Sequence, residues 1–309
     1  MKDIIVITGP TASGKTDISI EIALSINAEI INADSMQVYK QCNIGTAKPS
    51  KAELAKVKHH LIDFIEPFEE FSTARYKELA VEAIKNIMDE GKRVVITGGT
   101  GLYIDALVNN IDFSEDSGAG SARERYRNFL KRKGKDALFS KLEKRDRKAA
   151  EKVHPNNTRR VIRYLEILDG FDGSLEEYMK ATRKGPSEFR YHVFVLWPER
   201  DYIYKRIEKR VDIMLETGLV DEVRGLFENG LETSAQSMQG IGYKETIQYI
   251  HGEITYDGFV ELLKRNTRRY AKRQFTWMNR YSGAVRIPID ENTDRDEIVE
   301  MIKEHISKD

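Results

Sequence analysis

Four short apolar runs alternate with amphipathic segments along the chain. The runs are rich in β-branched residues, which is typical of buried parallel strands, and they cover Ile4–Thr8, Glu29–Ala33, Arg93–Thr97 and His192–Trp197. The intervening segments Asp17–Asn27 and Arg75–Glu90 carry apolar residues at helical spacing. Strands that alternate with helices predict a parallel sheet covered by helices, which is an α/β fold.

This alternation stops after Ile111. A small, polar linker follows at Ser114–Ser121, and the sequence from Ala122 to Leu168 is charged and helical, with no strand pattern. We therefore predict a core made of residues 1–113 and 190–309, with a helical C-terminal part from Asp201 onward. Residues 114–189 should form an all-helical insertion domain.

The first apolar run leads directly into a glycine-rich motif. Residues Gly9–Thr16 read Gly-Pro-Thr-Ala-Ser-Gly-Lys-Thr, which matches the G-x-x-x-x-G-K-T phosphate loop between a strand and a helix. In such a P-loop, backbone N–H groups and the helix N-terminus attract phosphate, the lysine reaches a terminal phosphate, and the threonine hydroxyl can bind Mg²⁺. The predicted diphosphate ligands in this loop are Gly9, Thr11, Ala12, Ser13, Gly14, Lys15 and Thr16.

Composition narrows the class of protein further. The 309 residues include 50 basic and 50 acidic side chains, so net charge alone indicates no polyanionic partner. The single cysteine, Cys42, fits a reducing compartment, and no apolar stretch approaches the roughly 18 residues that a membrane helix needs. We expect a soluble cytoplasmic protein without a membrane partner, and we take a monomer as the starting assumption.

Two further motifs follow predicted strands, at the sheet edge where parallel α/β proteins bind their ligands. Asp34 follows the second strand, where a carboxylate could accept a proton or could simply cap a turn. Thr100 lies in the segment Gly98–Tyr103 after the third strand, whose glycines suit either an anion site or close packing. The third strand does not end in aspartate, which argues against a motor or a switch GTPase.

Charge is strongly segregated near the C-terminus. The segment Leu262–Ile289 contains no acidic residue, and Arg265, Arg268, Arg269 and Lys272 would share one face of a helix, with aromatic residues beside them. Smaller arginine clusters occur at 123–127 and 159–163. Together these clusters favour a nucleic acid as the partner.

Eight strings in this linear order resemble tRNA dimethylallyltransferases, also called tRNA isopentenyltransferases, of the bacterial type. They span nearly the whole chain: GPTASGKT, INADSMQVY, IGTAKP, HHLID, GGTGLY, HPNNTRRVIRYLEI, MQGIGYKE and TRRYAKRQFTWM. Asn157 stands where the family usually has aspartate, and residues 117–121 lack the expected proline-containing loop.

The resemblance implies transfer of a dimethylallyl group from dimethylallyl diphosphate to N6 of the adenine that is 3′ of the anticodon, releasing pyrophosphate. It implies Asp34 as the base, Thr100 as a ligand of diphosphate or adenine, Mg²⁺ at Thr16, and either Arg206 or Arg210 on the diphosphate. The implied tRNA contacts are Asp34, Ser35, Met36, Gln37, Thr100, Arg123, Thr158, Arg159, Arg160, Val161, Ile162, Met238, Gln239, Gly240, Ile241, Gly242, Tyr243, Thr267, Arg268, Arg269, Tyr270, Ala271, Lys272, Arg273 and Gln274.

Two other functions fit parts of the sequence. A small-molecule or nucleoside kinase also pairs a phosphate loop with an acidic residue after the second strand. A non-catalytic RNA-binding protein gated by a nucleotide would explain the basic segment but would give Asp34 no role. A kinase would convert ATP to ADP and ignore tRNA, whereas the transferase would ignore ATP.

Overall fold

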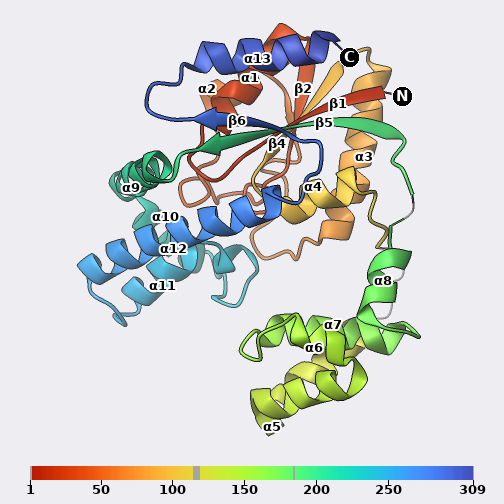
Figure 1. Cartoon of the computed structure of the whole chain (residues 1–309). Coiled ribbons are helices and arrows are strands. Elements are labelled where there is room, and N and C mark those ends of the chain that lie inside the picture. Colours follow the sequence, from red (N-terminus) through yellow and green to blue (C-terminus); the bar gives the residue numbers. More distant parts are fainter. Residues whose placement is uncertain (1, 114–118, 184, 309) are drawn as a thin grey trace. The chain divides into compact units, whose positions relative to one another are not determined.

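A six-stranded parallel sheet forms the centre of the protein (Figure 1). The computed structural model describes residues 2–113, 119–183 and 185–308. The strands lie in the order β3-β2-β4-β1-β5-β6. Their bounds are β1 Lys2–Thr8, β2 Ala28–Asn32, β3 His59–His60, β4 Arg93–Gly98, β5 Phe189–Pro198 and β6 Val285–Ile289. The α/β prediction and its four strands are confirmed.

Neither edge strand, β3 or β6, was predicted from the sequence. β3 has only two residues, too few for a periodic pattern, and it pairs with Ile30 and Ile31 of β2. β6 was assigned to a mainly helical region, but it pairs in parallel with β5, and only Ile287 and Ile289 of its side chains are buried. Exposed Arg286 and Pro288 alternate with them, and this period of two is the signal of a half-buried strand.

Helices cover both faces of this sheet. On one face, α1 (Lys15–Ser25) and α13 (Arg295–Lys308) bury Ile18, Ile22 and Ile302 against β1 and β5. On the other face lie α3 (Thr73–Asp89), α4 (Gly101–Val108) and α12 (Tyr256–Met278) (Figure 1). Because parallel strands are buried on both faces, their carboxyl ends and the loops that follow them remain the accessible edge.

The C-terminal helical part packs mainly through its longest helix. It comprises α9 (Arg200–Glu216), α10 (Leu219–Glu228), the 3₁₀ turn η2 (Ser237–Gln239), α11 (Tyr243–Ile250) and α12 (Tyr256–Met278). Helix α12 packs against α9 and α11, and the short helix α2 (Lys51–Leu54) follows the loop after β2. No helix within the described residues is both long and apolar enough to cross a membrane.

Residues 109–187 form a second compact unit with its own core. Its helices are α5 (Ala119–Arg145, kinked at Gly134), α6 (Arg147–Glu151), α7 (Thr158–Gly170) and α8 (Leu175–Ala181). In the predicted linker Ser114–Ser121, residues 114–118 lie outside the described residues and Ala119 already belongs to α5. The Asn157 side chain caps α7 by accepting the N–H of Arg160, as aspartate would.

Gly98 gives the sharpest test of the packing at the ligand edge of the sheet. A Cβ atom at Gly98 would lie 2.2 Å from the carbonyl carbon of Ala33, in the backbone that follows β2. Gly98→Ala should lower the free energy of unfolding by about 1–3 kcal/mol in urea titrations. Gly225→Ala, on a helix where nothing lies within 4 Å of the added Cβ, should instead be neutral or stabilising. Equal effects of the two substitutions would contradict this packing.

Candidate active site

The phosphate loop joins β1 to α1 and forms part of a cavity of about 190 Å³. Ala12 and Gly14 have φ angles of 66° and 91°, so the chain turns tightly before the first helical residue, Lys15. The Ser13 hydroxyl is buried and has no hydrogen-bond partner within the described residues. A buried hydroxyl without a partner is costly, so this loop is suited to an anion that would accept a hydrogen bond from Ser13.

Residues from several other elements line the same cavity. Asn32 and Asp34 come from the end of β2, Gln37 from the loop beyond it, and Arg206 and Arg210 from α9. The structure therefore brings the predicted phosphate loop, the predicted base and both candidate arginines to one place.

Burial changes the pKa values of the ionisable groups in this cavity. Burial, with a further contribution from Arg210, lowers the pKa of Lys15 to about 7, although Asp34 opposes the shift. The pKa of Arg210 is lowered by burial and by Arg206. The cations are thus poorly solvated and repel one another, so a multivalent anion bound among them would replace the missing solvation.

Asp34 combines the two roles that the sequence left open. Its Oδ1 accepts the backbone N–H of Met36 at 2.9 Å, while its own N–H donates to Asn32 Oδ1 at 3.1 Å. The carboxylate therefore caps a turn and also lines the cavity. Burial raises its pKa above the ordinary value of 3.8, in spite of these backbone hydrogen bonds and the nearby Lys15. A raised pKa makes an ionised carboxylate a better proton acceptor.

Both candidate arginines contact the phosphate loop, in different ways. Arg206 Nε donates to the carbonyl of Ala12 at 2.7 Å, and its guanidinium also lies over the ring of Tyr202. An Arg210 Nη donates to Thr11 Oγ1 at 3.3 Å. Arg206 therefore supports the loop backbone, whereas the more enclosed Arg210 is the arginine that stands beside Lys15 and Asp34.

Thr100 is not among the described residues that line the phosphate-loop cavity. Its hydroxyl accepts the backbone N–H of Ser35 at 2.9 Å and donates to Ser35 Oγ at 3.2 Å. Thr100 therefore holds the turn that carries Asp34, which is a positioning role.

Gln274 of α12, predicted as a tRNA contact, has a structural role that its sequence motif did not indicate. Its Oε1 accepts the N–H of Thr11 at 2.8 Å, and its Nε2 donates to the carbonyl of Gly99 at 2.9 Å. The residue is only 4% exposed. One side chain thus ties the phosphate loop to the turn after β4. The buried positions Leu263, Thr267, Ala271, Gln274 and Met278 recur at helical spacing, a pattern that could have revealed it.

Fewer residues of α12 are available to bind a polyanion than the sequence predicted. Thr267 and Ala271 are buried, Arg268 pairs with Glu208 at 2.7 Å, and Lys264 pairs with Asp212 at 2.6 Å. The exposed cations of the helix and the turn after it, here named the basic face, are Arg265, Arg269, Lys272, Arg273 and Arg280. No carboxylate in the described part of the chain forms an ion pair with any of them, so this face can bind an external polyanion.

The predicted contacts at 238–243 mostly brace a loop near the cavity. Met238 and Tyr243 are fully buried, and Gly240 and Gly242 are also enclosed, which leaves Gln239 exposed and Ile241 partly exposed. The Tyr243 hydroxyl donates to Glu222 at 2.7 Å, and Glu222 accepts the backbone N–H groups of residues 43–45. The motif thereby fixes the loop that follows Asp34.

In the second unit, Arg159 and Arg160 are exposed at the start of α7, whereas Val161 and Ile162 belong to its hydrophobic core. Arg123 forms an ion pair with the buried carboxylate of Glu166 at 3.1 Å. Of the predicted contacts here, the two exposed arginines and the partly exposed Thr158 retain surface for a polyanion, whereas Arg123 is partly neutralised.

The cavity also has the donors for a hard cation. Thr16 and the carboxylates of Asp17, Asp34 and Glu53 line it, but no cluster of three or more metal-ligating side chains occurs among the described residues. This set does not form a complete protein cage. It fits Mg²⁺, which usually takes one or two protein ligands together with phosphate oxygens and water.

The fold and this cavity define a phosphate-loop α/β protein, and comparisons identify its family. Residues 37–281 match the IPP transferase family model. A tRNA dimethylallyltransferase of Acetivibrio thermocellus is 45% identical over 99% of this chain and 98% of that protein, and one of Clostridioides difficile is 43% identical over 98% of each.

Solved structures agree with these matches. The tRNA isopentenylpyrophosphate transferase of Bacillus halodurans is 38% identical, with a TM-score of 0.73 over 100% of this chain and 98% of that chain. A eukaryotic dimethylallyltransferase, solved acting on tRNA, is 29% identical, with a TM-score of 0.83 over 100% of this chain and 80% of that one. The chain belongs to the IPP transferase family.

Removing the Gln274 amide should loosen the site. Gln274→Ala leaves the partly buried N–H of Thr11 and the buried carbonyl of Gly99 without this partner, so the free energy of unfolding should fall by about 1–3 kcal/mol in urea titrations. Thr276→Ala, at an exposed position of the same helix, should change it by less than about 0.5 kcal/mol. An equally small effect at Gln274 would contradict the bridge.

The lowered pKa of Lys15 predicts proton uptake when diphosphate binds. At pH 8 most Lys15 amines are neutral in the free protein, because their pKa is about 7, and a bound anion should recharge them. Calorimetry of pyrophosphate binding in buffers of different ionisation enthalpy should show about one proton more taken up by the wild type than by Lys15→Arg. At pH 6 the difference should vanish, because Lys15 is already charged. Equal uptake at pH 8 would contradict the shift.

Proposed function

We propose that the protein transfers a dimethylallyl group from dimethylallyl diphosphate to N6 of the adenine 3′ of the anticodon in tRNA. The observation that carries the proposal is the meeting of Asp34 with Lys15 and Arg210 in one phosphate-loop cavity. Membership of the IPP transferase family and the names of the relatives support it. The basic face of α12 supports a nucleic-acid substrate.

The phosphate loop would act on the leaving group. The N6 lone pair attacks C1 of the dimethylallyl group while the bond from C1 to the diphosphate oxygen breaks, and the oxygen keeps the electron pair. Charge therefore grows on the diphosphate, where Lys15, Arg210 and the Ser13 hydroxyl can stabilise it. Mg²⁺ held by Thr16 and phosphate oxygens would add positive charge to the same group.

Asp34 would take the proton that N6 loses when the new C–N bond forms. The exocyclic amine of adenine is a poor nucleophile, so a base at hydrogen-bond distance both orients it and removes its proton. The Asn32 and Met36 hydrogen bonds, with Thr100 on the adjacent Ser35, would hold the carboxylate in place. The target adenine must leave the stacked loop to reach this enclosed position.

A kinase remains the alternative from another enzyme class, because a phosphate loop and an acidic residue after β2 also suit ATP. The two functions separate in one assay of phosphate products. With dimethylallyl diphosphate and unmodified tRNA together, we expect pyrophosphate release, and with either alone we expect none. Conversion of ATP to ADP with a small acceptor, without any need for tRNA, would overturn the proposal.

Asp34→Asn tests the base. The substitution keeps the size and the turn-capping oxygen but removes the proton acceptor, so transfer should slow by about 10²–10⁴-fold in single-turnover assays. Pyrophosphate affinity should not fall, because the substitution removes a negative charge close to Lys15. The control Asp63→Asn, at a carboxylate that pairs with Lys48 of the cavity lining, should slow transfer far less. A rate unchanged by Asp34→Asn would show that another group accepts the proton.

Arg269→Glu tests the basic face. Loss of one phosphate contact should weaken tRNA binding at moderate salt and reduce the slope of log K against log salt by about 1. The control Arg93→Glu lies at the opposite end of the sheet, at the start of β4, and should leave both quantities unchanged. Fluorescence anisotropy of labelled tRNA measures both, and equal slopes for the wild type and Arg269→Glu would place the RNA elsewhere.

A further inference from the structure

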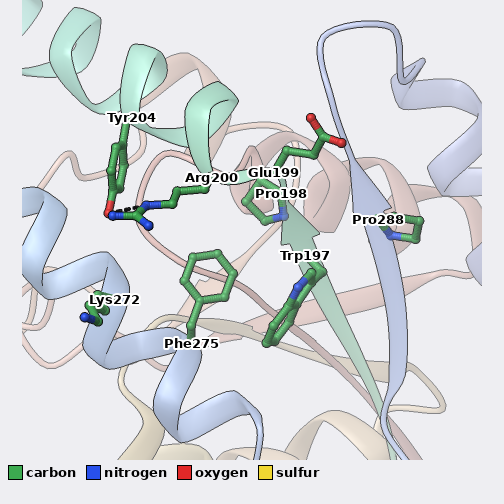
Figure 2. Close-up of a pocket in the computed structure, with 8 residues that line it drawn as sticks. All are labelled: Trp197, Pro198, Glu199, Arg200, Tyr204, Lys272, Phe275 and Pro288. Atoms are coloured by element: carbon green, nitrogen blue, oxygen red, sulfur yellow. Dashed lines mark hydrogen bonds between the residues drawn. The ribbon is translucent and has the colours of Figure 1, made fainter.

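An aromatic cavity of about 430 Å³ lies where β5 meets α9, separate from the phosphate-loop cavity (Figure 2). Four elements and the turn after β5 supply its walls: Trp197, Pro198, Glu199, Arg200, Tyr204, Lys272, Phe275 and Pro288. None of these residues lines the phosphate-loop cavity, and all belong to the compact unit that contains the sheet. The chemistry proposed above leaves this second cavity without a role.

Its walls offer ring surface beside positive charge. The rings of Trp197 and Phe275 meet edge to face, with centroids 4.8 Å apart, and both side chains are only partly buried. The Arg286 guanidinium lies 4.7 Å from the Trp197 ring centre. Aromatic rings and guanidinium planes that are open to solvent are the surfaces on which proteins stack single-stranded bases.

Two cations, Arg200 and Lys272, also line the cavity. Arg200 lies over the ring of Tyr204 and donates to its hydroxyl, and Lys272 belongs to the basic face of α12. Glu199 is the only acidic residue of the lining, and Figure 2 shows its carboxylate directed away from Trp197 and Phe275. This charge pattern complements a phosphate backbone whose base enters the cavity, and it disfavours a cationic partner.

The cavity is built into the support of the proposed active site. Leu196, directly before Trp197, packs so closely on Gly9 of the phosphate loop that a Cβ there would lie 2.9 Å from Leu196 Cβ. Phe275 directly follows Gln274, which holds the same loop through Thr11. The lining residues Trp197 and Phe275 are therefore direct neighbours of the two residues that contact the phosphate loop. A third lining residue, Lys272, belongs to the basic face.

We propose that the aromatic cavity binds an unstacked base of the substrate RNA, a neighbour of the adenosine that is modified. This inference rests on the proposed function. Extrusion of the target adenine removes the stacking partner of the adjacent nucleotides, so a protein surface that stacks one of them stabilises the opened loop. Each stacked base contributes roughly a fivefold to 150-fold gain in affinity.

The test compares the effect of removing one RNA base on binding to the wild type and to variants of the cavity. Anticodon stem-loop RNAs with one base removed at each loop position beside the target adenosine would be titrated against the wild type, Trp197→Leu and Phe275→Leu. At one position, base removal should weaken wild-type binding about fivefold to 150-fold but change binding to the two variants by less than about twofold. Trp197→Phe keeps a ring for stacking and should restore the wild-type pattern.

Tyr256→Leu, which removes an exposed aromatic side chain at the far end of α12, is the matched control and should behave as the wild type. Thermal denaturation of each variant separates unfolding from loss of stacking, and Phe275→Leu keeps the test valid if Trp197→Leu does not fold. Base removal that weakens every variant as much as the wild type would overturn this inference alone if dimethylallyl transfer persists. Absence of both RNA binding and transfer would overturn the proposed function as well.

Discussion

The two hydrogen bonds of the Gln274 amide hold the candidate active site together. Through them, α12 fixes the Thr11 N–H of the phosphate loop and the Gly99 carbonyl of the turn after β4. Because Gln274 is buried between these segments, the position of the basic face and the shape of the anion cavity depend on the same side chain. A single constraint thereby couples the surface suited to RNA with the cavity suited to diphosphate.

Desolvation shifts the pKa values of the charged groups in this cavity. Lys15, Arg210 and Asp34 are close enough to interact electrostatically. Burial lowers the pKa of Lys15 and of Arg210 and raises that of Asp34, and each shift favours the neutral form of the group. Buried like charges of this kind are unfavourable without a ligand and would gain stability from a bound anion. In the proposed reaction, these fixed charges would need little reorganisation as the diphosphate leaves. The same burial makes Asp34 more basic than an exposed carboxylate.

Local patterns in the sequence predicted much of the fold. The phosphate loop, the four central strands and the position of Asp34 after β2 follow from apolar runs and from the rule that parallel strands present their carboxyl ends together. The roles of Gln274, Glu222 and Thr100 did not follow, because each depends on contacts with segments far away in the sequence.

Charge was harder still to interpret from sequence. Arg268 and Arg123 counted as candidate RNA contacts, but each pairs with a carboxylate brought to it by packing, Glu208 and Glu166 respectively. A linear run shows which cations are present, whereas only the tertiary structure shows which of them remain exposed and uncompensated.

Mass spectrometry of nucleosides tests the central claim most directly. Unmodified tRNA would be incubated with the protein, dimethylallyl diphosphate and Mg²⁺, digested to nucleosides and analysed against a reaction without protein. The account predicts that one adenosine, 3′ of the anticodon, gains a dimethylallyl group on N6. Recovery of only unmodified adenosine, from a folded protein that binds both substrates, would contradict it.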